Sequence, residues 1–408
     1  MSNCSYATLL AMNWLVAWSV VSIPVSLSLA SESPMSRDRV LRPGNPDEAG
    51  MSDNCLNQAV RILSEETQSG RVLATSILVA RAASVVLQRG FGKLCLKPDA
   101  PFAKPDTIYF VASITKPFTA AALMRLVDRG LVCLSDPVQK YLPEFQGPER
   151  QRVRVQDLLS HTSGLPDMLP ENLELRRAHA PLSEFVKHTM TTPLLYEPGT
   201  SFSYQSMGIL LAAEIVERLS HSSLRELEKK ELFEPLGMKD SMLGLGGRSI
   251  DSTAWCQGRP TYATNERDQE LFGPNSLYWR DFGHPWGGMH SSAVDLAVFL
   301  QMFLNGGIYG GKRILSVAAV EAMTSNQNRS INSPWGLGWG LKNSPVHSCF
   351  GDVSSERTFG HLGATGTVAW ADSARDLLCI ILTTRPIDVD SSSLLRRVSN
   401  LVASAAQQ

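Results

Sequence analysis

The period of the apolar positions changes along the chain, and each change marks a different predicted element. Apolar residues recur at helical spacing between Leu56 and Leu63, which predicts a helix there. Two short β-rich runs follow, at 74–80 and 85–87, and residues 81–84 lie between them. Runs of this length around a short polar connection predict a β-hairpin.

The β pattern returns late in the chain. Three runs indicate strands, at 336–341, 366–371 and 377–384. Residues 372–375, between the last two runs, suit a hairpin loop. A helix is predicted for the end of the chain, over 391–405.

Between these strands the chain reads as helix and loop, with a helical subdomain over about 113–240. Residues 244–290 are instead rich in Gly, Pro and aromatic residues without a clear period, which is typical of a segment that borders or covers a binding site. Strands at both ends with helices inserted between them predict one antiparallel sheet flanked by helices. The predicted fold class is α/β of the α+β type.

The first thirty residues differ from the rest of the chain. Residues 7–30 carry no charged side chain, and Ser28 and Ala30 form the small-x-small pattern of a signal-peptidase site. We therefore expect a signal peptide over 1–30, a polar linker over 31–50 and a folded domain over 51–408. A signal peptide predicts that the protein is exported to the periplasm or the medium. The region before the apolar block lacks Lys and Arg, so an uncleaved membrane anchor and a mis-assigned start remain alternatives.

Composition narrows the function classes. The chain is 43% hydrophobic and 19% charged, and its formal net charge is −1. This balance gives no electrostatic case for nucleic acid, so a small-molecule partner is expected. The cysteines form no CxxC pair and the histidines show no HxH or HxxxH spacing, so we expect neither a metal nor another cofactor. The spacing leaves open whether a disulfide forms after export.

The segment most informative about chemistry is Val111-Ala-Ser113-Ile-Thr-Lys116-Pro117. Proline is tolerated in the first turn of a helix, so Pro117 predicts that a helix begins near Ser113, with Ser113 as its N-cap. The three-residue spacing then places Lys116 on the same face as Ser113. A serine hydroxyl is a weak nucleophile that needs a base, and a buried lysine in its neutral form can supply one. Ser-x-x-Lys alone is a weak motif, and an accidental match is the alternative.

Two further segments carry candidate residues. Tyr204-Gln-Ser206 lies in a loop before an amphipathic helix, with Ser203 or Ser206 as its cap. The glycine-spaced turn His361-Leu-Gly363-Ala364 leads into a strand, and its amides are suited to bind an oxyanion. Taken singly, these pieces are better explained by a partly buried tyrosine with a satisfied hydroxyl and by an ordinary Gly-rich turn with a surface histidine.

Together and in this order, the three segments resemble the serine β-lactamase and penicillin-binding-protein superfamily. The resemblance is to the class C β-lactamase-related branch, which includes esterase-like members. Two connecting segments, 155–166 and 287–296, also resemble that branch. The likeness spans about residues 50–400.

The resemblance implies roles for the site residues. Ser113 would attack a carbonyl and form an acyl-enzyme, and Lys116 would help to deprotonate it. Tyr204 stands at the position of the second-motif tyrosine, which carries the proton to the leaving group. The backbone amides of Ser113 and Ala364 would form the oxyanion hole.

Two departures from the family's motifs bear on the substrate. Ser206 replaces the asparagine of Tyr-x-Asn, and His361-Leu-Gly363 replaces Lys-Thr-Gly. The replaced lysine and threonine help to hold a substrate carboxylate in β-lactam enzymes. The departures therefore favour an ester or amide without that carboxylate, cleaved by an esterase-like serine hydrolase. The alternatives are a β-lactamase or D-amino-acid peptidase of penicillin-binding-protein type and, third, a non-catalytic binding scaffold.

Overall fold

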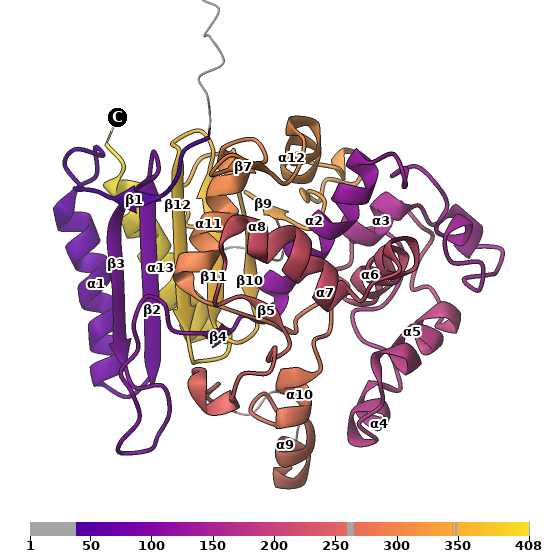
Figure 1. Ribbon diagram of the computed structural model, residues 1–408, viewed down its shortest axis with the longest axis horizontal. Helices are drawn as coiled ribbons and strands as arrows, with labels where there is room; N and C mark the ends of the chain where they lie inside the picture. Colours follow the sequence, from indigo (N-terminus) through magenta and orange to yellow (C-terminus); the bar gives the residue numbers. More distant parts are fainter. Residues whose placement is uncertain (1–37, 259–264, 345, 347–348, 408) are drawn as a thin grey trace, which may run out of the picture. The chain divides into compact units, whose positions relative to one another are not determined.

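A computed structural model describes residues 38–258, 265–344, 346 and 349–407 of the protein. Its centre is a seven-stranded sheet in the order β1-β3-β2-β12-β11-β10-β9 (Figure 1). Neighbouring strands are antiparallel except β1, which pairs parallel to β3. The strands are β1 Arg42–Pro43, β3 Ser84–Gly92, β2 Ala74–Arg81, β12 Leu377–Thr383, β11 Thr367–Asp372, β10 Thr358–Gly363 and β9 Gly340–Leu341.

Both faces of this sheet are buried. Side chains alternate along a strand, so Ile77 and Val79 of β2 join one hydrophobic cluster while Leu78 and Ala80 join another. All seven residues of β12 are buried, as expected for a strand covered on both sides. The two clusters are therefore separate cores on opposite faces.

The helices α1 (Asp53–Gln68) and α13 (Val389–Ala405) cover one face. Figure 1 shows α1, in indigo, beside the first strands and α13, in yellow, behind the last ones. The opposite face packs against α11 (Ala293–Leu304) and the helical region beyond it. The two ends of the described chain thus meet on one side of the sheet, because α1 and α13 also contact each other.

The helical region lies between β3 and β9 in the sequence. Its other helices are α2 Thr115–Asp128, α3 Val155–Leu159, α4 Asn172–Arg177, α5 Leu182–Thr191, α6 Met207–Ser220, α7 Leu224–Glu228, α8 Glu234–Leu236, α9 Glu266–Phe272, α10 Leu277–Asp281 and α12 Val317–Thr324. A three-stranded sheet joins this region to the sheet edge, with β4 (Tyr109–Phe110) and β5 (Met242–Leu243) on either side of β6 (Met289–Ser291). A hairpin of β7 (Ile308–Tyr309) and β8 (Lys312–Arg313) follows α11.

The predicted fold class, hairpin and terminal helix are confirmed, but one predicted strand is largely wrong. Of residues 336–341, the structure forms a strand only at Gly340–Leu341. Gly338 adopts a left-handed φ of +81°, which breaks an extended run. Its amide donates to the carbonyl of Leu159 in the helical region instead of to a sheet neighbour.

The expected N-terminal segments are described only in part. The predicted signal peptide lies outside the described residues. Within the expected linker, Arg42–Pro43 pairs with β3, so this part of 31–50 belongs to the sheet. In the portions of the chain that the structure describes, no helix is both long enough and apolar enough to cross a bilayer.

Candidate active site

Ser113 lies in a 3-10 turn, Ala112–Ile114, that joins β4 to α2. The preceding residue, Ala112, has a left-handed φ of +47°, an uncommon conformation that non-glycine residues retain where the surroundings impose it. The hydroxyl of Thr115 donates to the carbonyl of Ala112 at 2.6 Å and thereby ties the turn to the helix. Ser113 itself is partly exposed, whereas its neighbours are buried.

The prediction that Ser113 caps α2 is wrong. The helix begins at Thr115, and the cap position belongs to Ile114, which has no capping side chain. The extra 3-10 turn moves Ser113 out of the cap position, and its Oγ accepts a hydrogen bond from Lys116 Nζ at 3.0 Å. The predicted proximity of Ser113 and Lys116 is therefore present, and Pro117 lies in the first turn of the helix as expected.

Lys116 is fully buried. Its ammonium donates to Ser113 Oγ and, at 2.9 Å, to the carbonyl of Trp286. Burial lowers the pKa of Lys116 to about 7, although the negative charge of Asp167 opposes this shift. A large fraction of Lys116 is therefore neutral at pH 7 and able to accept a proton.

Tyr204 approaches the same pair from the loop before α6. Its side chain forms a hydrogen bond with Ser113, and its ring centroid lies 4.7 Å from Lys116 Nζ. Burial raises the pKa of Tyr204, with a smaller contribution in the same direction from Asp167. Tyr204 is therefore a neutral phenol that carries its proton near pH 7, whereas Lys116 is partly deprotonated there.

Ser206 occupies the N-cap position of α6, but its hydroxyl does not cap the helix. Ser206 Oγ instead donates to Asp167 Oδ1 at 2.6 Å. Sequence reasoning did not select Asp167. A lone acidic residue in the Gly-Leu-Pro-Asp167 turn is a weak indication by itself. Its place at the site depends on a contact across 39 residues of sequence, which no local pattern shows.

The turn between β10 and β11 is fastened to the segment that carries Ser113. Thr365 Oγ1 donates to the carbonyl of Phe110 at 2.6 Å, and Thr367 Oγ1 donates to that of Val111 at 3.1 Å. A Cβ on Gly363 would lie 2.2 Å from the Val111 carbonyl oxygen, so only glycine permits this approach. The predicted oxyanion residue Ala364 lies exposed in this turn.

His361 lies on β10 and is completely buried, unlike the surface histidine that an ordinary turn would carry. Its Nδ1 lies 2.7 Å from the carbonyl oxygen of Leu362. The imidazole also packs near the rings of Tyr204 and Trp335, with centroid distances of 6.0 and 5.8 Å. The structure thus gathers Ser113, Lys116, Tyr204 and His361 into one cluster.

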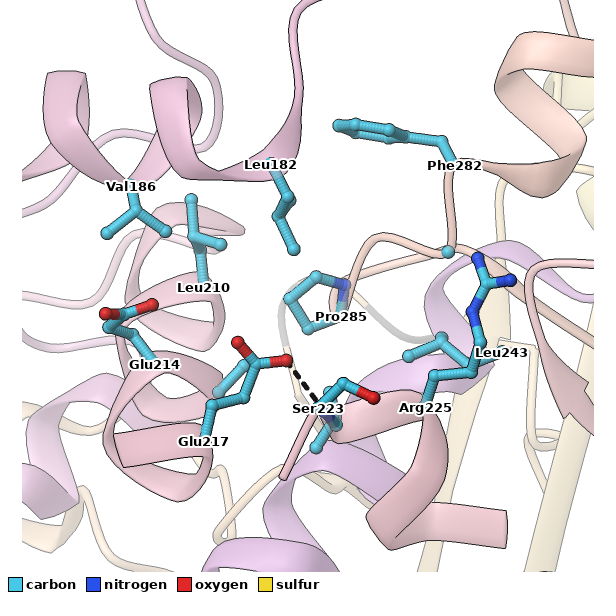
Figure 2. A pocket seen from close by; sticks show the side chains of 13 residues that line it. Leu182, Val186, Leu210, Glu214, Glu217, Ser223, Arg225, Leu243, Phe282 and Pro285 are labelled. Carbon is cyan, nitrogen blue, oxygen red and sulfur yellow. Dashed lines mark hydrogen bonds between the residues drawn. The ribbon is translucent and has the colours of Figure 1, made fainter. Parts of the chain in front are cut away.

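A separate cavity of about 160 Å³ lies among α5, α6, α7 and the 282–285 loop. Figure 2 shows apolar side chains such as Leu182 and Leu210 around it, with the carboxylates of Glu214 and Glu217 at one side. Neither Ser113 nor Lys116 lines this cavity. The candidate site is therefore the cluster around Ser113, and the cavity is distinct from it.

Comparison with known proteins identifies the family. Residues 59–403 match the model of the family described as Beta-lactamase, and the chain therefore belongs to that family. The prediction of a serine hydrolase of this superfamily is confirmed.

Individual relatives differ in their described activities. A protein of Escherichia coli (strain K12) called "Putative D-alanyl-D-alanine carboxypeptidase" is 27% identical over 386 residues, which cover 85% of this chain and 86% of the relative. A penicillin-binding-protein homologue from Caulobacter crescentus superimposes with a TM-score of 0.71 at 23% identity, over 86% of this chain and 99% of the other. A family VIII carboxylesterase superimposes with a TM-score of 0.69 at 20% identity, over 86% of this chain and 98% of the other. The two structural likenesses establish the fold.

Proposed function

We propose that the protein is an exported serine hydrolase that cleaves carboxylic esters, and related amides, through an acyl-enzyme on Ser113. The observation that carries this proposal is the hydrogen bond of 3.0 Å between Ser113 Oγ and a buried Lys116 whose pKa falls to about 7. A hydroxyl and a neutral amine at this distance form an activated nucleophile.

In the proposed acylation, every proton transfer takes place among the substrate, Ser113, Lys116 and Tyr204. Lys116 Nζ takes the Ser113 proton as Oγ bonds to the substrate carbonyl carbon. The carbonyl oxygen becomes an oxyanion, and in this proposal the backbone amides of Ser113 and Ala364 donate hydrogen bonds to it. The bond to the leaving alkoxide then breaks, and Tyr204 donates the proton that the alkoxide needs. Water then attacks the acyl carbon and gives a proton to the Tyr204 phenolate, the bond between Ser113 Oγ and the acyl carbon breaks, and Lys116 returns its proton to Oγ as the acid leaves.

The same geometry favours a substrate without a free carboxylate. His361, a buried side chain with Nδ1 against its own strand, stands at the position of the lysine in Lys-Thr-Gly. Leu362 cannot replace the hydroxyl of the motif threonine. The resemblance to a carboxypeptidase-type relative in E. coli supports the second candidate, a D-amino-acid peptidase.

Covalent labelling tests the proposal. The full-length protein is treated with a fluorescent fluorophosphonate and, separately, with a fluorescent penicillin. We expect the fluorophosphonate to label the wild type and Ser69→Ala, a variant of an exposed serine, but not Ser113→Ala. Penicillin labelling that requires Ser113 would favour the peptidase or β-lactamase, and equal fluorophosphonate labelling of wild type and Ser113→Ala would refute the nucleophile.

A further inference from the structure

An exposed carboxylate is fixed beside the candidate nucleophile. Asp167 lies in the loop that follows α3, and Oδ1 accepts the hydrogen bond of 2.6 Å from Ser206 Oγ. Ser206 is buried and lies two residues after Tyr204. This contact holds the carboxylate next to the catalytic cluster, and its charge acts on both Lys116 and Tyr204.

The carboxylate of Asp167 forms no ion pair within the described part of the chain. Among the residues that the structure describes, no lysine, arginine or histidine nitrogen lies within 4.0 Å of it. Asp167 is exposed, so its carboxylate is accessible to a ligand. Uncompensated charge at the edge of a site selects a ligand group of the opposite sign.

The cations nearby do not cancel this preference. Lys116 is buried and already donates to Ser113 and to the Trp286 carbonyl. His361 is enclosed, with Nδ1 against the Leu362 carbonyl. Among the described side chains of this cluster, a substrate carboxylate would therefore meet a fixed anion, whereas an ammonium would meet the exposed carboxylate of Asp167.

We propose that Asp167 is a specificity determinant that binds a protonated amine of the substrate. The substrate class is then esters or amides of amino acids or amino alcohols, and this inference rests on the proposed function. The bond from Ser206 fixes the carboxylate in one orientation, so that less conformational freedom is lost when an ammonium binds.

Three phenyl esters with the same alcohol and acyl tails of equal length test the inference: 3-aminopropionate, butyrate and succinate. The tails end in an ammonium, a methyl group and a carboxylate. We expect kcat/KM to be highest for the ammonium ester and lowest for the carboxylate ester, after subtraction of the Ser113→Ala blank. Protonated 2-(dimethylamino)ethyl acetate and 3-methylbutyl acetate, which differ only in the charged nitrogen, examine the leaving-group side in the same way.

The decisive quantity is the ratio of kcat/KM between the charged and neutral members of a pair. Asp167→Asn also alters the field at Lys116, but that effect is common to both substrates and cancels in the ratio. We expect Asp167→Asn to reduce the ammonium preference by about twofold to fivefold, as expected for a solvent-exposed charge pair. Ser206→Ala releases the carboxylate of Asp167 and should reduce the ammonium preference by a smaller factor. The control Asp47→Asn, at an exposed site, should leave the ammonium preference unchanged.

The outcomes separate this inference from the proposed function. Ser113-dependent hydrolysis without an ammonium preference in either series overturns the role of Asp167 alone. The same conclusion follows if Asp167→Asn keeps the wild-type ratio, or if the protein labels at Ser113 but cleaves none of these esters. Hydrolysis that survives Ser113→Ala overturns the proposed function instead.

Discussion

At the scale of single residues, the site depends on one amine kept away from water. Lys116 has no exposed surface, and neither of its two hydrogen-bond partners carries a full negative charge. Burial disfavours the ammonium of Lys116 more than the carboxylate of Asp167 favours it, so the pKa falls to about 7. The pKa of the half-buried Tyr204 in the same cluster is raised, so the phenol remains protonated. Desolvation thus favours the neutral form of both groups, a free amine on Lys116 and an intact phenol on Tyr204.

The first prediction concerns the pH dependence of hydrolysis. Below pH 7 Lys116 is mostly an ammonium and cannot accept the Ser113 proton, so kcat/KM for a neutral ester should rise through an apparent pKa near 7 and then level off. Asp167→Asn removes a charge that raises the Lys116 pKa and should move this limb to lower pH. Steady-state rates between pH 5 and 9 on phenyl butyrate measure both. An inflection that stays in place in Asp167→Asn would contradict the electrostatic coupling.

The second prediction concerns the stability cost of the same amine. The folded-state pKa, about 7, lies below the usual 10.5, so the unfolded chain binds more protons between these values. Burying Lys116 therefore costs its full amount of folding free energy below pH 7, and this cost fades as the pH rises to about 10. Lys116→Met should therefore raise the free energy of unfolding at pH 6, by at most about 5 kcal/mol, with a smaller gain at pH 9. Urea unfolding measures this, and the exposed-site control Lys230→Met should show no such pH-dependent gain.

How far the sequence predicted these residues depends on the range of the contacts. Ser113 and Lys116 are three residues apart, so helical spacing alone placed them together. Asp167 and Ser206 meet across 39 residues, and no periodicity reports such a contact. The burial of His361 likewise depends on packing against Tyr204 and Trp335, from distant segments. The local part of the site was predictable, and its charge environment was not.

At the scale of elements, the β10–β11 turn sets the position of the predicted oxyanion amides. The turn contacts the Ser113 segment through side-chain hydroxyls, because Thr365 and Thr367 donate to the carbonyls of Phe110 and Val111. The other side of the same segment pairs with β6, where the amide of Val111 donates to the carbonyl of Met289. The Ser113 turn is therefore held between two strands that belong to different sheets.

The third prediction tests this attachment. Thr365→Val keeps the shape of the side chain but removes the hydrogen bond to the Phe110 carbonyl, which is worth about 1 kcal/mol to stability. We expect a larger loss in catalysis, about tenfold to a hundredfold in kcat/KM, because small displacements of an oxyanion donor are costly. Thr365→Ser restores the hydroxyl and should recover most activity. If Thr365→Val loses stability but keeps its rate, the turn does not position the amide.

Strand prediction succeeded where the pattern was long and failed where it was short. The runs of β2 and β12 are continuous, β-rich and buried, and both strands were expected at nearly their observed bounds. In contrast, β1 is a two-residue parallel edge strand, which is too short to produce a period. At 336–341 apolar residues suggested a longer strand, but Gly338 turns the chain there.

At the scale of the whole molecule, both ends of the described chain build the framework of the site. The pairing of β2 with β12 joins them over seven residue pairs, from Arg81 with Leu377 to Thr75 with Thr383. The helical region that supplies Lys116 and Tyr204 lies between these strands in sequence, whereas His361 and Ala364 come from the late strands. The candidate site is therefore assembled only when segments from both the helical region and the late part of the chain have come together.

The last prediction follows from this arrangement. A chain that ends at Arg385 retains Ser113, Lys116, Tyr204 and His361 but lacks α13, whose residues fill the core on one face of the sheet. Trp370 would lose its hydrogen bond of 3.0 Å to Ser399. Exposing the apolar face of the sheet to water would cost roughly 25 cal/mol of folding free energy per Å². We expect this chain to give no cooperative urea transition, to bind a hydrophobic dye and to resist fluorophosphonate labelling. Labelling at the wild-type rate would instead mean that the helical region and the late strands assemble the site without the second core.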